Sequence, residues 1–383
     1  MIDGWLGLNA WQCIVTVMVM THITIASVTM YLHRSQAHRS VDFHPLVNHF
    51  FRSWLWMTTG MRTKDWVSIH RKHHAKCETQ EDPHSPQVLG LKKVLWEGAE
   101  LYRAEAKNLE TMERYGHGTP NDWIEKYLYN KAWLGITLMF ILDVLLFGVK
   151  GISVWGVQMI WIPFFAAGVI NGVGHAIGYR NFESPDASTN LIPWGILIGG
   201  EELHNNHHTY PTSARLSLKW YEFDIGWLYI RLLSILKLAK VRRVAPKVAL
   251  SNSPGSTLCE NTLKSLLSNR FQVMTYYSHT VLKPALLKAQ THANAQQKRM
   301  LNKLKHSWGK LSEVDLHGLS RFPQLKTEIE LKKSLQRIWD QKNASAKELI
   351  DQLSLWCEQA KATQNKTLEQ FVEYLNRYQV QAS

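Results

Sequence analysis

Three short histidine-rich stretches carry most of the chemistry that this sequence could perform. They are HRSQAH (33–38), HRKHH (70–74) and HNNHH (204–208). An imidazole is mostly uncharged at neutral pH, and it is the side chain that most often binds a metal. On a helix, His70, His73 and His74 share one face because they are spaced i, i+3 and i+4. This spacing predicts a metal site.

The second and third stretches repeat one spacing, HxxHH. HRKHH alone is also compatible with a solvated basic segment, but its repetition makes accident a poor explanation. His33 and His38 are five positions apart, so they converge only at a helix end or a bulge. Four histidines that lack this geometry are interpreted as surface or structural residues: His44, His49, His84 and His117.

A fourth segment, VINGVGHAIGYR (169–180), places Asn171 and His175 four residues apart at the end of an apolar run. Polar side chains at that depth in a membrane are costly unless they have a function. With His175, the motifs supply nine imidazoles, too many for one tetrahedral zinc ion. Iron accepts imidazole ligands and is redox active. We therefore interpret the set as a non-haem di-iron site.

The elements that must position these residues are largely apolar. Residues 10–32 contain no Lys, Arg, Asp or Glu, and 23 residues suffice to cross a hydrocarbon core of about 30 Å. Residues 132–149 and 152–170 predict a hairpin of two further spans. A signal peptide is the alternative for the first segment, but its start lacks basic residues and its apolar run is too long.

Residues 44–61 are apolar and aromatic, but Arg52 and His49 lie in the middle of the run. We interpret this segment as an interfacial helix whose charged edge faces water. Residues 1–9 have no Lys or Arg, whereas residues 34–76 have eight. The positive-inside tendency then predicts that the histidine-rich side is cytoplasmic, in a multi-pass membrane protein.

The motifs HRSQAHR, HRKHHAKCETQEDPHSP, NGVGHAIGYRNFE and GGEELHNNHHTYP resemble, in order and spacing, those of the membrane fatty-acid desaturases. The resemblance covers residues 10–245 and is strongest to bacterial delta-9 acyl desaturases related to animal stearoyl-CoA desaturases. It implies that Asn171 holds one of two irons through a water. It implies these direct iron ligands: His33, His38, His70, His73, His74, His175, His204, His207 and His208.

The resemblance also implies O2-dependent dehydrogenation of a saturated acyl chain, which leaves a cis double bond at delta-9 and water. Such chemistry needs an apolar channel that excludes water and fixes two methylenes beside the metals. The aromatic stretch before Asn171 could line this channel, together with Trp54, Trp56, Met57 and Trp66, although such residues also serve as core or membrane belt. Glu201 or Glu202 could orient a ligand imidazole, or face solvent.

Two other functions use the same residues. A membrane di-iron hydroxylase or alkane monooxygenase differs only in transferring oxygen to the substrate. A metal transporter or sensor would require ligands inside the spans, whereas these motifs lie at span ends. The animal enzymes have an additional transmembrane helix before the first motif, for which this chain has too few residues, so we expect its N-terminus to lie outside the cytoplasm.

Electrons must come from another protein, because the sequence contains no CxxC pair, no dinucleotide-type glycine loop and no HPGG haem motif. A ferredoxin or a flavin reductase is expected. The four cysteines are scattered singly, as in a reducing compartment. The basic surface suits an acidic electron carrier, anionic lipid or a CoA phosphate, and the bacterial inner membrane is the expected location.

The predicted fold is all-α: few transmembrane helices, a cytoplasmic helical cap that holds the di-iron site, and a helical C-terminal extension. Residues 1–249 form the predicted desaturase domain and residues 250–257 a linker. Residues 258–383 are basic, with the periodicity of amphipathic helices that pack together or lie on the membrane. No nucleic-acid-binding motif occurs there, and we assign this region no chemistry.

Overall fold

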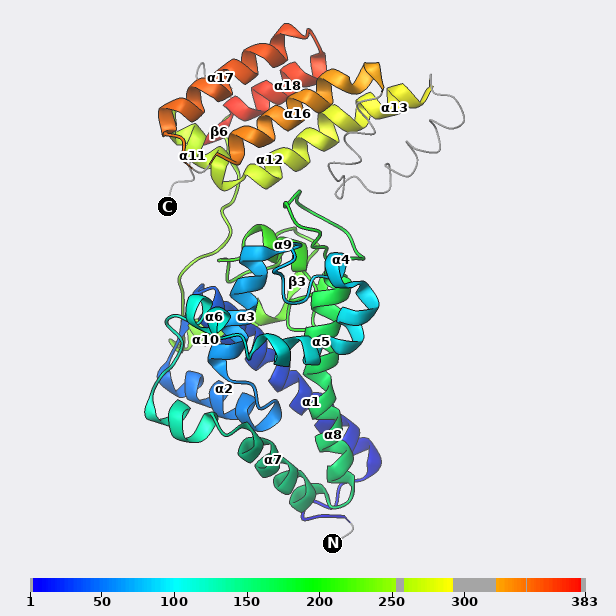
Figure 1. Ribbon diagram of the computed structural model, residues 1–383, viewed down its shortest axis with the longest axis vertical. Helices are drawn as coiled ribbons and strands as arrows, with labels where there is room; N and C mark the ends of the chain where they lie inside the picture. The colour runs from blue at the N-terminus through cyan, green and yellow to red at the C-terminus, as the bar shows by residue number, and fades with distance from the viewer. Residues whose placement is uncertain (1–2, 253–257, 292–321, 342, 380–383) are drawn as a thin grey trace. The chain divides into compact units, whose positions relative to one another are not determined.

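A computed structural model describes residues 3–252, 258–291, 322–341 and 343–379, which are mostly helical, as predicted, with a few short strands (Figure 1). The chain divides into two compact units. Unit 1 comprises Met1–Arg180 and Pro185–Ala245, and unit 2 comprises Asn181–Ser184 and Pro246–Ser383. Of the predicted linker 250–257, residues 253–257 lie outside the described residues.

Unit 1 contains the histidine motifs. Its longer helical elements are α1 (Ala10–Ser27), the π-helix η1 (Val28–Ala37), α2 (Pro45–Thr58), α3 (Thr63–Lys76), α5 (Leu91–Glu105), α7 (Ala132–Phe147), α8 (Lys150–Ile162), the π-helix η3 (Pro163–Ile170) and α10 (Ile225–Ile235). Its shorter ones are α4 (Pro86–Leu89), α6 (Leu109–Tyr115), the π-helix η2 (Glu125–Tyr129), the 3₁₀-helix η4 (Val173–His175) and α9 (His204–Thr209). Strand β1 (Val41–Phe43) pairs antiparallel with β4 (Ala239–Val241), and β2 (Trp194–Gly195) pairs parallel with β3 (Phe223–Asp224).

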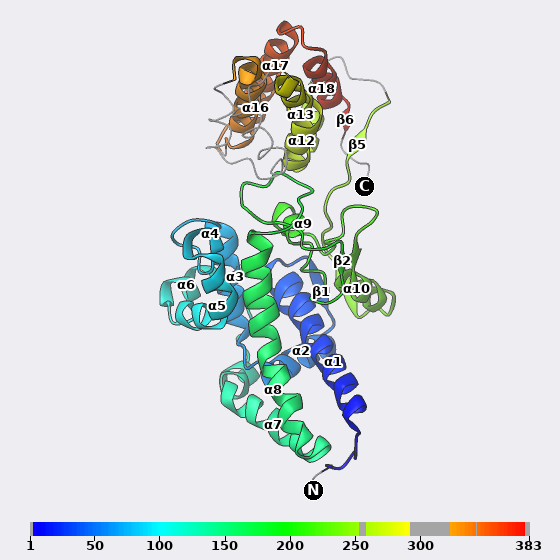
Figure 2. The ribbon, with the colours of Figure 1, turned by 90° about the vertical axis from the view of Figure 1, so that its right-hand side faces the viewer.

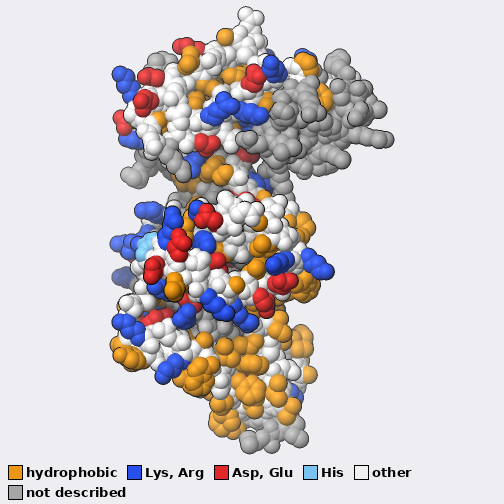
Figure 3. Space-filling view, viewed as in Figure 1, with side chains coloured by type: hydrophobic (Ala, Val, Ile, Leu, Met, Phe, Trp, Pro, Cys, Tyr) orange, Lys and Arg blue, Asp and Glu red, His pale blue; other side chains and the backbone are white. Residues whose placement is uncertain are grey.

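Two helices of unit 1 are long and apolar enough to cross a membrane. They span Ala10–Ala37 and Lys150–His175. Helices α1 and α8 pack against each other, and α7 lies beside α8 (Figure 2). Large apolar side chains of α1 and α8 are exposed, including Trp11, Val19 and Ile160. Hydrophobic side chains cover much of the surface where these helices lie (Figure 3). Exposed apolar surface on this scale is typical of a lipid-facing region.

The expected hairpin is present, but its first helix is shorter than predicted. Helix α7 has 16 residues, which rise about 24 Å, less than a hydrocarbon core of about 30 Å. It ends at Gly148, whose φ of 64° is left-handed and stops the helix. The next helix then packs closely, since a Cβ at Gly151 would collide with the carbonyl oxygen of Asp143.

Helix α2 forms within the predicted interfacial segment, but one part of that prediction is wrong. The Arg52 side chain does not face water. Its guanidinium is buried and donates to Asp122 at 2.7 Å and to Glu125 at 2.8 Å. These carboxylates neutralise the cation inside the protein, and neither is close to Arg52 in sequence.

Unit 2 is a helical bundle. Its elements are α11 (Glu260–Ser268), α12 (Arg270–Tyr277), the π-helix η5 (Ser278–Leu282), α13 (Lys283–Thr291), the 3₁₀-helix η7 (Pro323–Leu325), α16 (Lys326–Trp339), α17 (Ala346–Ala362) and α18 (Lys366–Asn376). Strand β5 (Ala249–Leu250) pairs antiparallel with β6 (Tyr378–Gln379).

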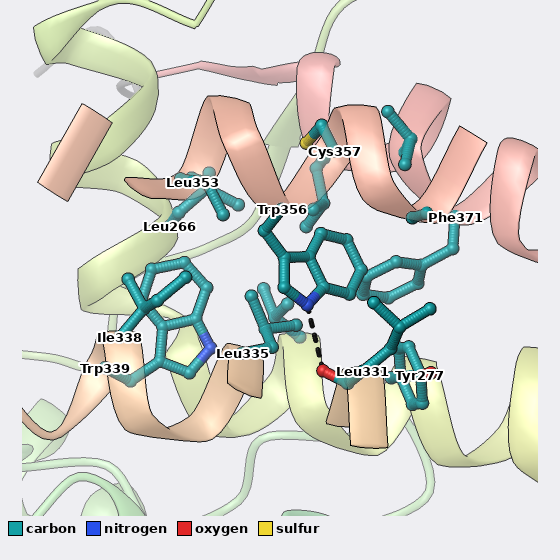
Figure 4. Close-up of a cluster of buried hydrophobic side chains, with 14 of the residues drawn as sticks. Leu266, Tyr277, Leu331, Leu335, Ile338, Trp339, Leu353, Trp356, Cys357 and Phe371 are labelled. Carbon is teal, nitrogen blue, oxygen red and sulfur yellow. Dashed lines mark hydrogen bonds between the residues drawn. The ribbon is translucent and has the colours of Figure 1, made fainter. Parts of the chain in front are cut away.

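The amphipathic helices of unit 2 pack on one another around Trp356, which is 2 % exposed (Figure 4). Its indole N–H donates to the carbonyl oxygen of Leu331 at 2.9 Å, so the buried polar atom is satisfied. Tyr277 and Phe371 pack edge-to-face beside it, with ring centroids 4.9 Å apart. The apolar stripes seen in the sequence thus face a common core.

Candidate metal centre

All nine histidines singled out from the sequence lie in two clusters inside unit 1. Within each cluster, one side-chain nitrogen per residue lies within 4.8 Å of the others. The five-histidine cluster contains His33, His38, His70, His74 and His207. The four-histidine cluster contains His73, His175, His204 and His208.

A π-helix brings together the two histidines of the first motif, which are five positions apart. In η1 the His38 N–H donates to the His33 carbonyl oxygen at 3.0 Å, which is an i to i+5 bond. The wider turn brings the two imidazoles onto one face, with ring centroids 4.9 Å apart. Residues five apart therefore converge at the C-terminal end of this π-helix, where His38 is the C-cap residue, as the sequence required.

The nitrogens of the five-histidine cluster meet at short distances. His207 Nε2 lies 3.0 Å from His33 Nε2 and 2.8 Å from His74 Nε2, and His38 Nε2 lies 2.8 Å from His70 Nε2. Two metal–nitrogen bonds of about 2.1 Å at right angles would separate their nitrogens by about 3.0 Å. The observed spacing matches that of imidazoles that share a metal ion.

The four-histidine cluster joins three elements. His73 comes from α3, His175 ends the helix that began at Lys150, and His204 and His208 come from α9. His175 Nε2 lies 3.2 Å from His73 Nε2 and 2.9 Å from His204 Nε2. All four residues are buried, so the cluster is enclosed by protein.

The protonation state of these imidazoles suits a metal. Burial, with the neighbouring imidazoles, lowers the pKa well below its usual value in six of them: His38, His70, His74, His204, His207 and His208. At neutral pH these rings are uncharged and keep a lone pair for coordination. Among the described residues, nothing within hydrogen-bond distance satisfies the buried atoms His204 Nδ1, His207 Nδ1 and His208 Nε2. The donor set fits two metal ions.

Four carboxylates each accept a hydrogen bond from one imidazole of the two clusters. The pairs are His33–Glu201 (2.7 Å), His73–Asp82 (2.9 Å), His175–Glu78 (2.9 Å) and His208–Asp186 (3.1 Å). A carboxylate on the far nitrogen fixes the tautomer and the orientation of a metal-binding imidazole. Although burial opposes the effect, the hydrogen bond from His73 lowers the pKa of Asp82, which therefore stays ionised.

The sequence pointed to only one of these four carboxylates, Glu201. Its neighbour Glu202 accepts hydrogen bonds from the backbone N–H groups of Ile198 and Gly200 instead. Glu78 and Asp82 were missed, although both follow HRKHH within eight residues. Acidic residues next to a histidine motif are the pattern that could have identified them. Asp186 has no such neighbour in the sequence.

Replacing Asp82 with asparagine should weaken metal binding by about 10- to 100-fold. The substitution conserves the size of the side chain, but it removes the carboxylate that accepts from His73 Nδ1 and from two backbone N–H groups. Metal content of the purified protein, measured during titration with a chelator, tests this. Glu81→Gln is the matched control, because Glu81 is exposed and its carboxylate pairs only with Lys76 among the described residues. Equal metal retention in both variants would contradict the prediction.

A cavity of about 480 Å³ leads to both clusters. His33 and His70 of one cluster and His204 of the other form part of its wall, with Asn171 and Glu201 beside them. The remaining wall has an apolar part that includes Val28, Met61, Ile69, Ile136, Met159, Ile162, Ala166, Ala167 and Ile170. It also has polar residues: Thr58, Thr59, Arg62, Asp65, Tyr102, Arg103, Asn130 and Gln158. The volume is in the range of binding sites for elongated small molecules.

Of the three tryptophans proposed from the sequence to line a channel, only Trp66 lies on the cavity wall. Trp66 lies on the cavity wall and stacks on His70, with ring centroids 4.8 Å apart. Trp54 and Trp56 do not line it. Their indole N–H groups donate to Thr24 and to the Lys131 carbonyl oxygen. His84, interpreted as a surface or structural residue, is buried, lines the cavity and stacks on His73.

The comparisons with known proteins agree with the motifs. The fatty acid desaturase family matches residues 9–232. The sn-1 stearoyl-lipid 9-desaturase of a Synechocystis strain is 30% identical over 229 residues, which cover 59% of this chain and 70% of that protein. The delta-9 acyl-lipid desaturase 1 of Arabidopsis thaliana is 29% identical over 235 residues, which cover 60% of this chain and 74% of that protein.

The family match covers more than half of the chain, and it contains all nine clustered histidines and the cavity wall. The residues beyond it belong mostly to unit 2. The chain therefore belongs to the fatty acid desaturase family and is an oxidoreductase that acts on acyl chains.

Proposed function

We propose that this protein is an O2-dependent desaturase that introduces a cis delta-9 double bond into a saturated acyl chain of a membrane lipid. The names of its relatives, stearoyl-lipid and acyl-lipid 9-desaturases, support the substrate and the position. The catalytic part is the region predicted from the sequence, residues 1–249. We assign no catalytic role to residues 258–383, whose described parts are mostly helical.

The two histidine clusters are the proposed ligands of two iron ions. The five-histidine cluster holds one ion and the four-histidine cluster holds the other, with Asn171 acting through a water molecule. Iron bound there would supply the reaction of O2 with the acyl chain that removes two hydrogens and forms water. Glu201, Glu78, Asp82 and Asp186 hold the ligand imidazoles in the orientation that coordination requires.

The single observation that carries the proposal is the apolar cavity that leads to both clusters. Its walls can bury a hydrocarbon chain and exclude water, so the position of two methylenes beside the clusters decides where the bond forms. Trp66 and Ile69 lie near His70 and hold the chain against that side.

The proposed location is a membrane, with the histidine clusters on the cytoplasmic side, in accordance with the basic residues between 34 and 76. We propose the bacterial inner membrane. Electrons come from a separate ferredoxin or flavin reductase, because the sequence carries no motif for a second redox group. A cytoplasmic orientation places that partner on the same side of the membrane as the clusters.

The test is expression in a host that lacks O2-dependent desaturases, together with a ferredoxin and its reductase, followed by mass spectrometry of the membrane fatty acids. A cis monounsaturated chain that requires oxygen and is absent with His73→Ala supports the proposal. A hydroxylated chain would identify a hydroxylase instead. Absence of any product, with the protein folded and iron-loaded, would overturn the proposal.

A further inference from the structure

The loop between Tyr179 and Asn190 contributes to both compact units. Its two ends pair in unit 1, where the backbone N–H of each of these residues donates to the carbonyl oxygen of the other, at 2.9 and 2.7 Å. Residues 181–184, which we call the loop tip, are part of unit 2. Residues 186–188, which we call the returning arm, are part of unit 1, and only Pro185 lies between the two segments.

The returning arm contributes to two of the carboxylate–imidazole pairs of the four-histidine cluster. Asp186 accepts a hydrogen bond from His208 Nδ1 at 3.1 Å. The backbone N–H of Ala187 donates at 3.3 Å to Glu78 Oε1, the same oxygen that accepts from His175 Nδ1. Such carboxylates fix the orientation of metal-binding imidazoles. The position of the arm therefore affects two of the four imidazoles in this cluster.

The loop tip is held inside unit 2 by two helices. The backbone N–H of Glu183 donates to Thr275 Oγ1 of α12 at 2.9 Å, and its carboxylate pairs with Lys332 Nζ of α16 at 2.8 Å. The side chain of Lys332 is 4 % exposed and that of Glu183 is 16 % exposed. Phe182, the preceding tip residue, is buried as well.

The position of Lys332 in α16 is unusual for a helix of a packed bundle. Lys332 lies three and seven residues before Leu335 and Trp339, so it shares their buried stripe. Such a stripe ordinarily carries apolar side chains, and a buried ammonium group is strongly destabilising without a partner. Glu183 supplies that partner, so the loop tip is an integral part of unit 2.

We propose that unit 2 holds the loop tip so that Asp186 and Ala187 stay in place beside the four-histidine cluster, with Lys332 as a positioning residue. The chain itself provides the coupling, since one residue joins the tip to Asp186. Residues beyond the family match, which ends at residue 232, thereby contribute to one metal site. The proposal rests on the proposed function, since it treats the two clusters as metal sites.

Release of the tip should weaken the four-histidine site without abolishing it. Arg180 also donates to the carbonyl oxygen of Asp186, at 2.6 Å, so unit 1 retains part of the hold on the arm. The five-histidine cluster should keep its affinity, because Glu201, the carboxylate that pairs with its His33, lies outside the loop. A change confined to one of the two sites is therefore the signature of this coupling.

The first test is Lys332→Met, which removes the ion pair and leaves an apolar side chain in an otherwise apolar stripe, so unit 2 should stay folded. The metal-free full chain, purified in detergent, is titrated with Co(II) as the probe for both sites. We expect one site to bind about 10-fold more weakly than in the wild type, and the other to be unchanged. Lys326→Met is the matched control, because Lys326 lies on the same helix and its pair with Glu330 is exposed. It should bind Co(II) as the wild type does.

A second variant leaves every side chain in place. Two glycines inserted between Ser184 and Pro185 lengthen the connection, so the tip and the arm can move independently. The insertion should reproduce the selective weakening, and adding Lys332→Met to it should change little further. Unchanged affinity of both sites in the insertion variant, or equal weakening of the two sites, would overturn the proposal.

Desaturation is measured on the same proteins after they are loaded with iron. Selective weakening of one cobalt site, without desaturation by the wild type, would refute the proposed reaction and leave the coupling intact. Desaturation by the wild type, with the same cobalt affinities in every variant, would overturn the coupling and leave the reaction intact.

Discussion

Replacing His207 with alanine should lower product formation by more than about 100-fold and remove metal from the five-histidine cluster. His207 is 1 % exposed, and its Nε2 lies within 3.0 Å of the Nε2 atoms of His33 and His74. Loss of a residue that merely orients a ligand already costs about 10- to 100-fold in metal affinity or activity. Loss of the His207 imidazole, which lies between two other imidazoles of the cluster, should cost more.

The matched control is His117→Ala, because His117 is exposed and belongs to neither cluster. Iron per polypeptide and the fraction of unsaturated chains are measured on both variants at equal protein levels. The control should behave as the wild type in both. Normal iron content in His207→Ala would show that this residue is not a ligand.

The nine histidines could be found from the sequence because their geometry is largely local. In HxxHH, helix periodicity alone places the side chains on one face, so recognising the motif needs no knowledge of the fold. His175 was recognisable because it ends a long apolar segment. The meeting of four segments at one place followed from their expected position on one side of a membrane.

Other features depended on contacts that are distant in the sequence. Nothing in HRSQAH specifies a π-helix, yet that helix brings His33 and His38 together. Asp186 reaches His208 across 22 positions. Arg52 is buried because Asp122 and Glu125, about 70 residues away, neutralise it. Burial of a charge is decided by such partners, which local periodicity does not reveal.

In unit 2, too, some features could be predicted from local sequence and others could not. The helical periodicity of residues 258–383 predicted amphipathic helices, and α17 and α18 are two of them. The pairing of Leu250 with Tyr378 joins positions 128 residues apart. Short strands of this kind carry no sequence pattern long enough to recognise. Local pattern therefore predicted the helices, while the closure of the bundle came from tertiary contacts.

The second large effect is expected at Arg34, which holds the first and third histidine motifs together. Its guanidinium is 1 % exposed and donates to both oxygens of Asp224, at 2.9 and 3.1 Å. It also donates to the carbonyl oxygens of Gly199 and Ala214, on either side of HNNHH. Arg34 therefore connects η1 to the segment that carries His204, His207 and His208.

Arg34→Met should destabilise the protein by about 3–5 kcal/mol, because Asp224 would remain buried without its cation. Arg34→Lys should also destabilise the protein, since an ammonium group cannot donate to four oxygens in the geometry of a guanidinium. Denaturant unfolding of the purified protein in detergent measures both. We expect metal content to fall in parallel, as the two motifs separate.

Arg242→Met is the matched control, because Arg242 also pairs with an aspartate, Asp42, but both side chains are about half exposed. Solvent screens this pair, so its loss should destabilise the protein far less than loss of the Arg34–Asp224 pair. The two substitutions remove the same group and differ in burial. Equal destabilisation would show that burial of the Arg34–Asp224 pair does not determine its contribution, and that the link between the motifs lies elsewhere.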